Sequence, residues 1–354
     1  MNPGEQKVIR VLVVDDSRVV AEFLTDLLNS DARIQVVAVA RDGEEAVAAA
    51  QQTKPDVITM DIHMPKVNGF DATRTIMETC PAPIVIVSSN ASTDEVALNF
   101  RAIEAGALAV VARPNGADDR DHGAAKQLLD TVKLMSEVKV VKRWSRSRYA
   151  IPAYVPAKAE LEKLSGPVQV VAIGASTGGP AALQTLLSSL PKDFSLPVLI
   201  VQHMTPGFAA GFVEWLADSS RFSVRVALDG ESLRPGNAYV APDELHMGVR
   251  SGPRILLTAD AKESGVRPSV SFLLRSVRQV FGSNAVGILL TGMGRDGAEE
   301  LRRLKDAGAI TIAQDEASSV VHGMPGEAIS IGAAKHVLPP EAIARILASI
   351  APRP

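Results

Sequence analysis

Short aliphatic runs alternate with amphipathic stretches along the chain up to residue 135. Between the runs, apolar side chains recur at helical spacing, as Val96, Phe100 and Ile103 do. Repeated strand–helix units of this kind predict an α/β domain with a doubly wound five-stranded sheet and a site at the carboxyl ends of its strands. The predicted strands cover residues 8–14, 35–40, 57–60, 84–88 and 107–111.

A second α/β pattern begins at residue 168, where a predicted strand over 168–173 is followed by Gly-Ala-Ser-Thr-Gly-Gly and a helix. Pro180 suits the first turn of that helix. One face of the helix carries four leucines, Leu183, Leu186, Leu187 and Leu190. We therefore predict a second, C-terminal α/β domain that is doubly wound and mostly parallel. Its further predicted strands cover 198–202, 238–241, 254–257, 285–291 and 309–313.

The stretch between the two patterns has neither of them and reads as an interdomain linker. This stretch contains a run of basic residues, which is typical either of a solvated linker or of a segment that docks on an acidic partner. The predicted division is a domain at 1–138, a linker at 139–166 and a domain at 167–354. The basic residues and prolines of the linker are Lys139, Lys142, Arg143, Arg146, Arg148, Pro152 and Pro156.

Composition narrows the class of protein. Hydrophobic residues make up 46% of the 354 residues and charged residues 22%, which is enough apolar material for buried cores. A net charge of −3 produces no global attraction to nucleic acid, so no nucleic-acid partner is expected. The single cysteine, Cys80, excludes an internal disulfide and fits a reducing cytosol. Because no apolar stretch approaches the ~18 residues of a membrane span, we expect a soluble cytoplasmic protein without membrane insertion.

Charged and hydroxyl side chains gather at the predicted ends of the N-terminal strands. Asp15 and Asp16 follow the first strand and Asp61 the third; Ser88 ends the fourth strand, and Arg113 follows the fifth. Clustered carboxylates repel unless a cation neutralises them, and hard oxygen ligands favour Mg²⁺. An aspartate in such a site can attack a phosphoryl group, while a basic side chain offsets the charge. The plainer alternative is that these aspartates cap helices.

Ser176 lies in a Gly-x-Ser-x-Gly sequence between a predicted strand and a helix, where a nucleophile elbow would expose its hydroxyl. A capping serine in a plain strand-to-helix turn is the simpler interpretation of this pattern alone. A serine nucleophile requires a base, and His203 ends the next predicted strand, at the same edge of a parallel sheet. His246 and His322 are reserve candidates for the base.

The base in turn requires an orienting acid. Asp296 follows the strand at 285–291 in the loop Thr-Gly-Met-Gly-Arg-Asp-Gly. Together with Glu299 it also fits the N-terminal cap of the next helix. The glycines of this loop allow close backbone approach, so its amides and those around Thr177 are candidates for an oxyanion hole. The chain order Ser, His, Asp differs from that of the α/β-hydrolases.

With these aspartates at its strand ends, the segment 8–114 resembles the receiver domain of two-component systems. The resemblance implies that Asp61 is phosphorylated by a histidine kinase. It also implies that Mg²⁺ is held by Asp15, Asp16, Asp61 and the backbone carbonyl of His63.

The same resemblance makes Ser88 and Arg113 the residues that respond to the phosphoryl group. Two positions depart from the pattern: Arg113 replaces the usual lysine, and Val110 replaces the usual aromatic switch residue. Because arginine has a bulkier, planar head, we expect a different lifetime and readout of the phosphorylated state.

Residues 168–350 resemble the catalytic domain of chemotaxis protein-glutamate methylesterases. Together with the receiver, this resemblance covers nearly the whole chain apart from the linker. Five motifs lie in the same order: Gly-Ala-Ser-Thr-Gly-Gly at 174–179, Gln-His-Met at 202–204, Pro-Gly-Asn-Ala-Tyr-Val-Ala-Pro at 235–242, Thr-Gly-Met-Gly-Arg-Asp-Gly-Ala at 291–298 and Gly-Met-Pro at 323–325.

The resemblance implies that Ser176 is the nucleophile, His203 the general base and then acid, and Asp296 its orienting partner. No cofactor is expected for the esterase. Backbone amides at Thr177 and Met293 would hold the oxyanion. His322 stands where an aromatic residue is expected and Ser271 where aspartate is expected, and neither position alters the assignment of the triad.

The implied reaction is hydrolysis of glutamate γ-methyl esters on methyl-accepting chemoreceptors, with deamidation of receptor glutamines as a second reaction of the family. The receiver would obstruct the esterase cleft until Asp61 is phosphorylated. One alternative is a phosphorylation-gated receptor-binding adaptor with a degenerate hydrolase domain, against which the presence of all three triad residue types argues. Another is a transcriptional regulator, against which the large α/β C-terminal half and the lack of a basic recognition helix argue.

Overall fold

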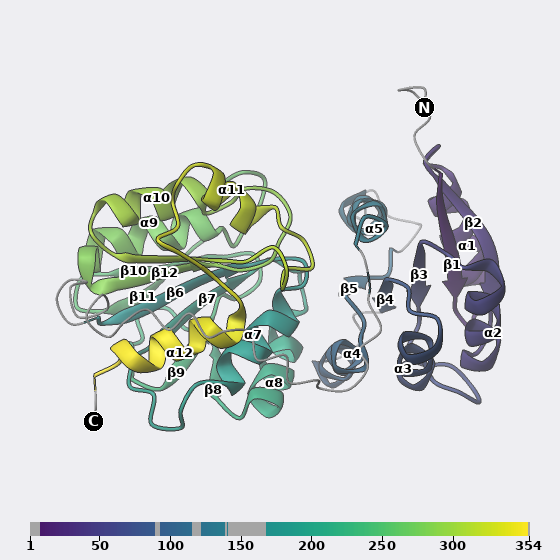
Figure 1. Cartoon of the computed structure of the whole chain (residues 1–354), viewed down its shortest axis with the longest axis horizontal. Helices are drawn as coiled ribbons and strands as arrows, with labels where there is room; N and C mark the ends of the chain where they lie inside the picture. The colour runs from purple at the N-terminus through teal and green to yellow at the C-terminus, as the bar shows by residue number, and fades with distance from the viewer. Residues whose placement is uncertain (1–7, 89–92, 115–121, 139, 141–167, 353–354) are drawn as a thin grey trace. The chain divides into compact units, whose positions relative to one another are not determined.

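The computed structural model describes residues 8–88, 93–114, 122–138, 140 and 168–352 (Figure 1). The chain divides into two compact units, 1–149 and 150–354. The predicted linker at 139–166 lies outside the described residues except for Val140, so the predicted domain limits stay predictions. None of the helices in the described ranges is long and apolar enough to cross a membrane.

The N-terminal unit is built on a five-stranded sheet with the order β2-β1-β3-β4-β5, in which every pair is parallel. Val11–Val14 and Val57–Met60 are buried on both faces, as expected for aliphatic strands covered by helices on two sides. The strands are β1 (Ile9–Val14), β2 (Ile34–Ala40), β3 (Val57–Met60), β4 (Ile84–Ser88) and β5 (Ala109–Ala112).

Helices cover both faces of this sheet (Figure 1). Side-chain caps set the start of two of them: Asp42 accepts from the N–H of Glu45 at 2.9 Å, and Asn68 accepts from that of Asp71 at 3.0 Å. The helices are α1 (Arg18–Asn29), α2 (Gly43–Thr53), α3 (Gly69–Thr79), α4 (Thr93–Ala105) and α5 (His122–Met135). Helices α2, α3 and α4 pack side by side.

The C-terminal unit contains a parallel seven-stranded sheet with the order β14-β13-β12-β6-β7-β9-β8. The chain reverses its direction of winding between β6 and β12, which places the expected site at their carboxyl ends. The strands are β6 (Val170–Ala175), β7 (Val198–Gln202), β8 (Ser223–Val226), β9 (Asn237–Val240), β12 (Ala285–Leu289), β13 (Ile310–Gln314) and β14 (His336–Leu338).

Two groups of helices enclose this sheet (Figure 1). One face carries α7 (Gly179–Ser188), α8 (Ala209–Ser220) and α12 (Pro340–Ile350). The other carries α9 (Val270–Phe281), α10 (Ala298–Asp306) and α11 (Met324–Ser330). A separate antiparallel pair, β10 (His246–Arg250) and β11 (Arg254–Thr258), packs against α9.

The predicted fold class is confirmed in both units. The strands predicted at 57–60, 84–88 and 198–202 coincide with β3, β4 and β7. Three strands were missed: β8 and β14 are short edge strands without full burial, and β10 contains His246 and Gly248 within a short apolar sequence. The segment predicted at 254–257 is a strand, but it pairs in the separate hairpin and not in the main sheet.

The side chain of Leu301 on α10 is fully buried in the core of the C-terminal unit. Truncation of this side chain measures how much the packing of α10 contributes to stability. We expect Leu301→Ala to lower the free energy of unfolding by about 3 kcal/mol, through lost burial and the cavity left behind. Urea denaturation followed by circular dichroism measures the change. Leu228→Ala is the control, because Leu228 is 65% exposed and its truncation should cost less than about 0.5 kcal/mol.

Candidate active site and phosphoacceptor site

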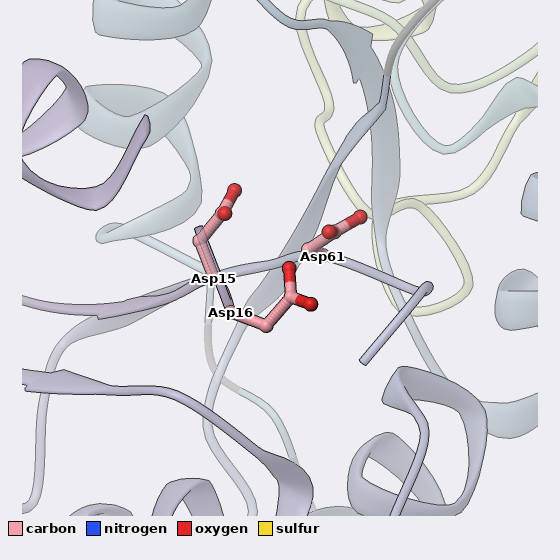
Figure 2. Close-up of side chains that lie close together, drawn as sticks. All are labelled: Asp15, Asp16 and Asp61. Carbon is pink, nitrogen blue, oxygen red and sulfur yellow. The ribbon is translucent and has the colours of Figure 1, made fainter. Parts of the chain in front are cut away.

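Parallel pairing of β1 with β3 assembles an acidic cluster in the N-terminal unit. Val14 pairs with Met60, so Asp15 and Asp16 leave β1 beside the point where Asp61 leaves β3. The N–H of Asp61 donates to the carbonyl of Val14 at 2.9 Å. One carboxylate oxygen from each of the three aspartates lies within 4.8 Å of the other two. Figure 2 shows the three side chains close together.

Crowding and burial act on the charge of this cluster. Burial raises the pKa of Asp15 from 3.8 to about 6 against the effect of Arg113, and it also raises the pKa of Asp61. A terminal nitrogen of Arg113 lies 3.4 Å from an oxygen of Asp15 and 3.4 Å from one of Asp61. The guanidinium therefore supplies part of the positive charge that the carboxylates need.

The donor set fits a hard divalent cation. It consists of carboxylate oxygens, which are the ligands that Mg²⁺ favours. The buried Asp15 Oδ2 accepts no hydrogen bond from the residues that the structure describes, so it has a lone pair to offer. Asp15, Asp16 and Asp61 could thus hold the ion, and the carbonyl of His63 remains a predicted ligand.

Ser88 ends β4 next to this cluster, and the N–H of Arg113 donates to its carbonyl at 2.7 Å. Its hydroxyl accepts a hydrogen bond from the side-chain amide of Asn99, a fully buried residue on α4. Asn99 therefore contacts the predicted switch serine from the adjoining helix. Val110, where the sequence lacks the usual aromatic residue, lies on β5 opposite Ile86.

In the C-terminal unit, pairing of β6 with β7 places Ser176 beside His203. Ala175 pairs with Gln202, and the N–H of His203 donates to the carbonyl of Ala175 at 2.9 Å. The side-chain nitrogen Nε2 of Gln202 donates to the carbonyl of Ser176 and to that of His203, each at 2.8 Å. One buried side chain therefore ties the backbones of the candidate nucleophile and the candidate base together.

Asp296 completes this arrangement from the loop after β12. Its Oδ2 lies 3.0 Å from Nε2 of His203. Asp296 also accepts from the N–H groups of Val270 at 2.7 Å and Ser271 at 3.0 Å, which open helix α9. The carboxylate is thus seated at a helix N-terminus, where its negative charge is stabilised.

These donors determine the ionisation of Asp296. Burial alone would raise its pKa, but the hydrogen bond and charge of His203, with the hydrogen bonds from Ser271 and Val270, outweigh that effect. The pKa of Asp296 is lowered from 3.8 to about 2. A carboxylate that stays ionised in a buried position is suited to hold an imidazole in one tautomer and orientation.

The backbone of the glycine-rich loop approaches Ser176 closely. A Cβ on Gly292 would lie 2.6 Å from Cβ of Ser176, so the position excludes any larger residue without a shift. The buried Thr291 hydroxyl donates to the carbonyl of Thr177 at 2.9 Å and joins the two loops. The N–H groups of Thr177 and Met293 donate to no acceptor in the described ranges, which leaves both available to a substrate oxygen.

Comparisons with known proteins agree with this arrangement. A family model for CheB methylesterase matches residues 171–347, and one for the response regulator receiver domain matches residues 11–121. A relative in Nitrosospira multiformis is 58% identical over 343 residues, which cover 97% of each chain. The chain belongs to the CheB methylesterase family.

The relative in Nitrosospira multiformis is named protein-glutamate methylesterase/protein-glutamine glutaminase. A relative in Syntrophus aciditrophicus with the same name, numbered 1, is 54% identical over 97% of this chain and 98% of its own. The crystal structure of the Thermotoga maritima CheB methylesterase catalytic domain has 36% identity and a TM-score of 0.51, and it covers 52% of this chain and 100% of that domain. The comparisons give no support to a degenerate hydrolase domain.

The structure joins two of the three predicted catalytic residues of the methylesterase domain by a direct contact, that of His203 with Asp296. Ser176 lies at the same edge of the sheet, where its N–H donates to the carbonyl of Thr291 at 3.0 Å. The contact of its hydroxyl with His203 remains a prediction. His246 has another role, because it is fully buried and bonded to Ala261 and Ser269. His322 pairs through its backbone with Gly292, beside the glycine-rich loop.

One structural interpretation from sequence needs correction. Asp296 does not cap the helix that follows it: α10 has Gly297 at its N-cap without a side-chain cap bond, and the carboxylate instead caps α9. Sequence analysis also missed Gln202 and gave Ser271 no part in the site, although Ser271 contacts Asp296 directly. Gln202 lies inside the Gln-His-Met motif, so its place next to His203 was the available signal.

The lowered pKa of Asp296 predicts a contribution to stability that depends on pH. Because the folded-state pKa lies below the ordinary value, the contribution is present above pH 3.8 and is lost as pH falls toward 2. We expect the destabilisation caused by Asp296→Asn to shrink by about 2 kcal/mol between pH 5 and pH 2, as urea denaturation would show. Asp193→Asn, at an exposed position, is the control for removing one negative charge. A difference that stays constant over this range would contradict the assignment.

Proposed function

We propose that this chain hydrolyses the γ-methyl esters of glutamate side chains on methyl-accepting chemoreceptors and releases methanol, under control of phosphorylation at Asp61. The observation that carries the proposal is the bond between His203 and the ionised, helix-capping Asp296, at the strand end where Ser176 lies. The name shared by the two relatives supports the substrate class. We place the reaction in the cytoplasm.

In the proposed reaction, the N–H at Nε2 of His203 donates to Asp296, so Nδ1 is the nitrogen with a free lone pair. Nδ1 takes the proton of the Ser176 hydroxyl as the oxygen attacks the ester carbonyl. The N–H groups of Thr177 and Met293 hold the negative oxygen of the tetrahedral intermediate. Protonated His203 is stabilised by Asp296 and then gives its proton to the leaving methanol.

A water molecule attacks the resulting acyl-enzyme, with His203 again as the base, and the receptor glutamate is released. A glutamine side chain would form an analogous tetrahedral intermediate, with an amino group in place of the methoxy group, and would reach the same acyl-enzyme with ammonia as the leaving group. We therefore include deamidation of receptor glutamines in the proposal, in agreement with the second half of the relatives' name.

In the receiver, we propose that Asp61 accepts a phosphoryl group from a chemotaxis histidine kinase. Asp15, Asp16 and the carbonyl of His63 would hold Mg²⁺ with it, and the ion would offset the negative charge of the transferred group. Arg113, already near Asp15 and Asp61, is placed to pair with the phosphoryl oxygens. The Ser88 hydroxyl would report the phosphorylated state.

Replacement of the nucleophile tests the reaction directly. We expect Ser176→Ala to abolish methanol release from methylated receptor membranes, because no other group supplies the attacking oxygen. Phosphorylation of Asp61 by a small-molecule phosphodonor should persist in this variant and serves as the control for an intact receiver domain. Continued methanol release by Ser176→Ala would overturn the assignment of the nucleophile, and inactivity of the unaltered protein would favour a receptor-binding adaptor.

Replacement of the phosphoacceptor tests the regulation. We expect Asp61→Asn to lose the stimulation of methanol release by a phosphodonor, because the amide cannot form the acyl phosphate. Arg113→Lys keeps the positive charge with a different geometry, so it should retain stimulation while altering the lifetime of the phosphorylated state. Methanol release with and without phosphodonor measures the first effect, and loss of labelled phosphate measures the second. Equal stimulation of Asp61→Asn and the unaltered protein would contradict the proposal.

A further inference from the structure

The hydroxyl of Ser271 joins helix α9 to the loop that carries Asp296. It donates to Oδ1 of Asp296 at 2.5 Å and accepts from the N–H of Gly297 at 2.9 Å. We propose that Ser271 is a positioning residue of the esterase, whose hydroxyl holds the Asp296 carboxylate in the orientation that receives Nε2–H of His203. This inference rests on the proposed function and adds a residue to its machinery.

The two oxygens of Asp296 have separate sets of partners. Oδ2 accepts from Nε2 of His203 and from the N–H of Val270. Oδ1 accepts from Ser269 Oγ at 3.1 Å and from both the N–H and the hydroxyl of Ser271. Rotation of the carboxylate about its Cβ–Cγ bond would break both sets, so the bonds to Oδ1 determine where Oδ2 points.

Ser271 differs from the other partners of Asp296 in also bonding the loop behind the carboxylate. Gly297 has a φ of 86°, a left-handed conformation that glycine adopts readily. Its N–H donates to the Ser271 hydroxyl, so the same oxygen restrains the residue and its neighbour. Ser271 therefore acts on both the side chain and the main chain at Asp296.

Substitution of Ser271 leaves the formal charge around Asp296 unchanged. A change in the titration of Asp296 after Ser271→Ala would therefore report the lost hydrogen bond and not a lost charge. Three titratable groups lie around this position. His203 bonds Asp296, His246 accepts from the N–H of Ser269, and Arg275 on α9 interacts electrostatically with Asp296. Arg275 is itself paired with Glu263 and Glu300.

The expected effects follow from a hydrogen bond to a buried anion. Ser271→Ala should lower kcat for methanol release about tenfold with KM within about twofold, because orientation of the base is lost and not receptor binding. It should also raise the pKa of Asp296 from about 2 toward 3.8, because one of its stabilising hydrogen bonds is removed. Ser271→Thr, which retains a hydroxyl, should restore most of both properties.

The experiment measures these quantities in the full-length chain. Methanol release gives kcat and KM, and NMR of protein with ¹³C-labelled aspartate carboxyl groups follows Asp296, assigned by comparison with Asp296→Asn. Ser276→Ala is the matched control: Ser276 lies on the same helix, bonds Leu273 and Val249 through its hydroxyl, and does not contact Asp296. It should lower stability without changing kcat or the titration of Asp296.

The outcomes separate this inference from the function on which it rests. An unaltered Asp296 titration and unaltered kcat in Ser271→Ala would overturn the role of Ser271, as would equal effects of Ser271→Ala and Ser276→Ala. Failure of the unaltered protein to release methanol would overturn the proposed function, and the NMR titration would still decide whether Ser271 holds Asp296.

Discussion

Backbone hydrogen bonds between parallel strands assemble each site, because Asp61, Ser176 and His203 each follow directly after a paired strand residue. Asp61 is bonded through its N–H to Val14, and His203 through its N–H to Ala175. Ser176 is bonded in the same way to Thr291, across the point where the winding reverses. Strand pairing therefore brings side chains that are far apart in sequence to the same edge of each sheet.

The two sites treat buried carboxylates in opposite ways. In the receiver, burial outweighs the positive charge of Arg113, and the pKa of Asp15 and that of Asp61 are raised. In the esterase, donors from α9 and His203 outweigh burial, and the pKa of Asp296 is lowered. An incompletely neutralised cluster suits residues that must recruit a cation, whereas a fully bonded anion suits a residue that only orients its neighbour.

Sequence patterns predicted the fold class. They also predicted that the triad candidates lie at one edge of the C-terminal sheet, because strand ends and glycine-rich loops are recognisable from local sequence. They did not predict which helix Asp296 caps, because α9 is distant from Asp296 in sequence and comes beside it only when the sheet forms. The role of Gln202 could not be predicted for the same reason. Its side chain donates to the carbonyl of its neighbour His203 and to that of Ser176, which is distant in sequence. The contact of Asn99 with Ser88 likewise depends on how α4 packs, which helical periodicity alone does not determine.

The choice of ring nitrogen at His203 has a consequence for precision. Nδ1, the base of the proposed mechanism, is bonded to the ring carbon that carries Cβ, whereas Nε2 lies at the far side of the imidazole. Bonds from the Gln202 side chain and to the carbonyl of Ala175 hold the main chain of His203. Rotation about Cβ–Cγ would still move Nδ1, and the contact of Nε2 with Asp296 restrains that rotation. Accuracy at the reacting atom of the proposed mechanism therefore needs two anchors, the end of β7 for the main chain and Asp296 for the plane of the ring.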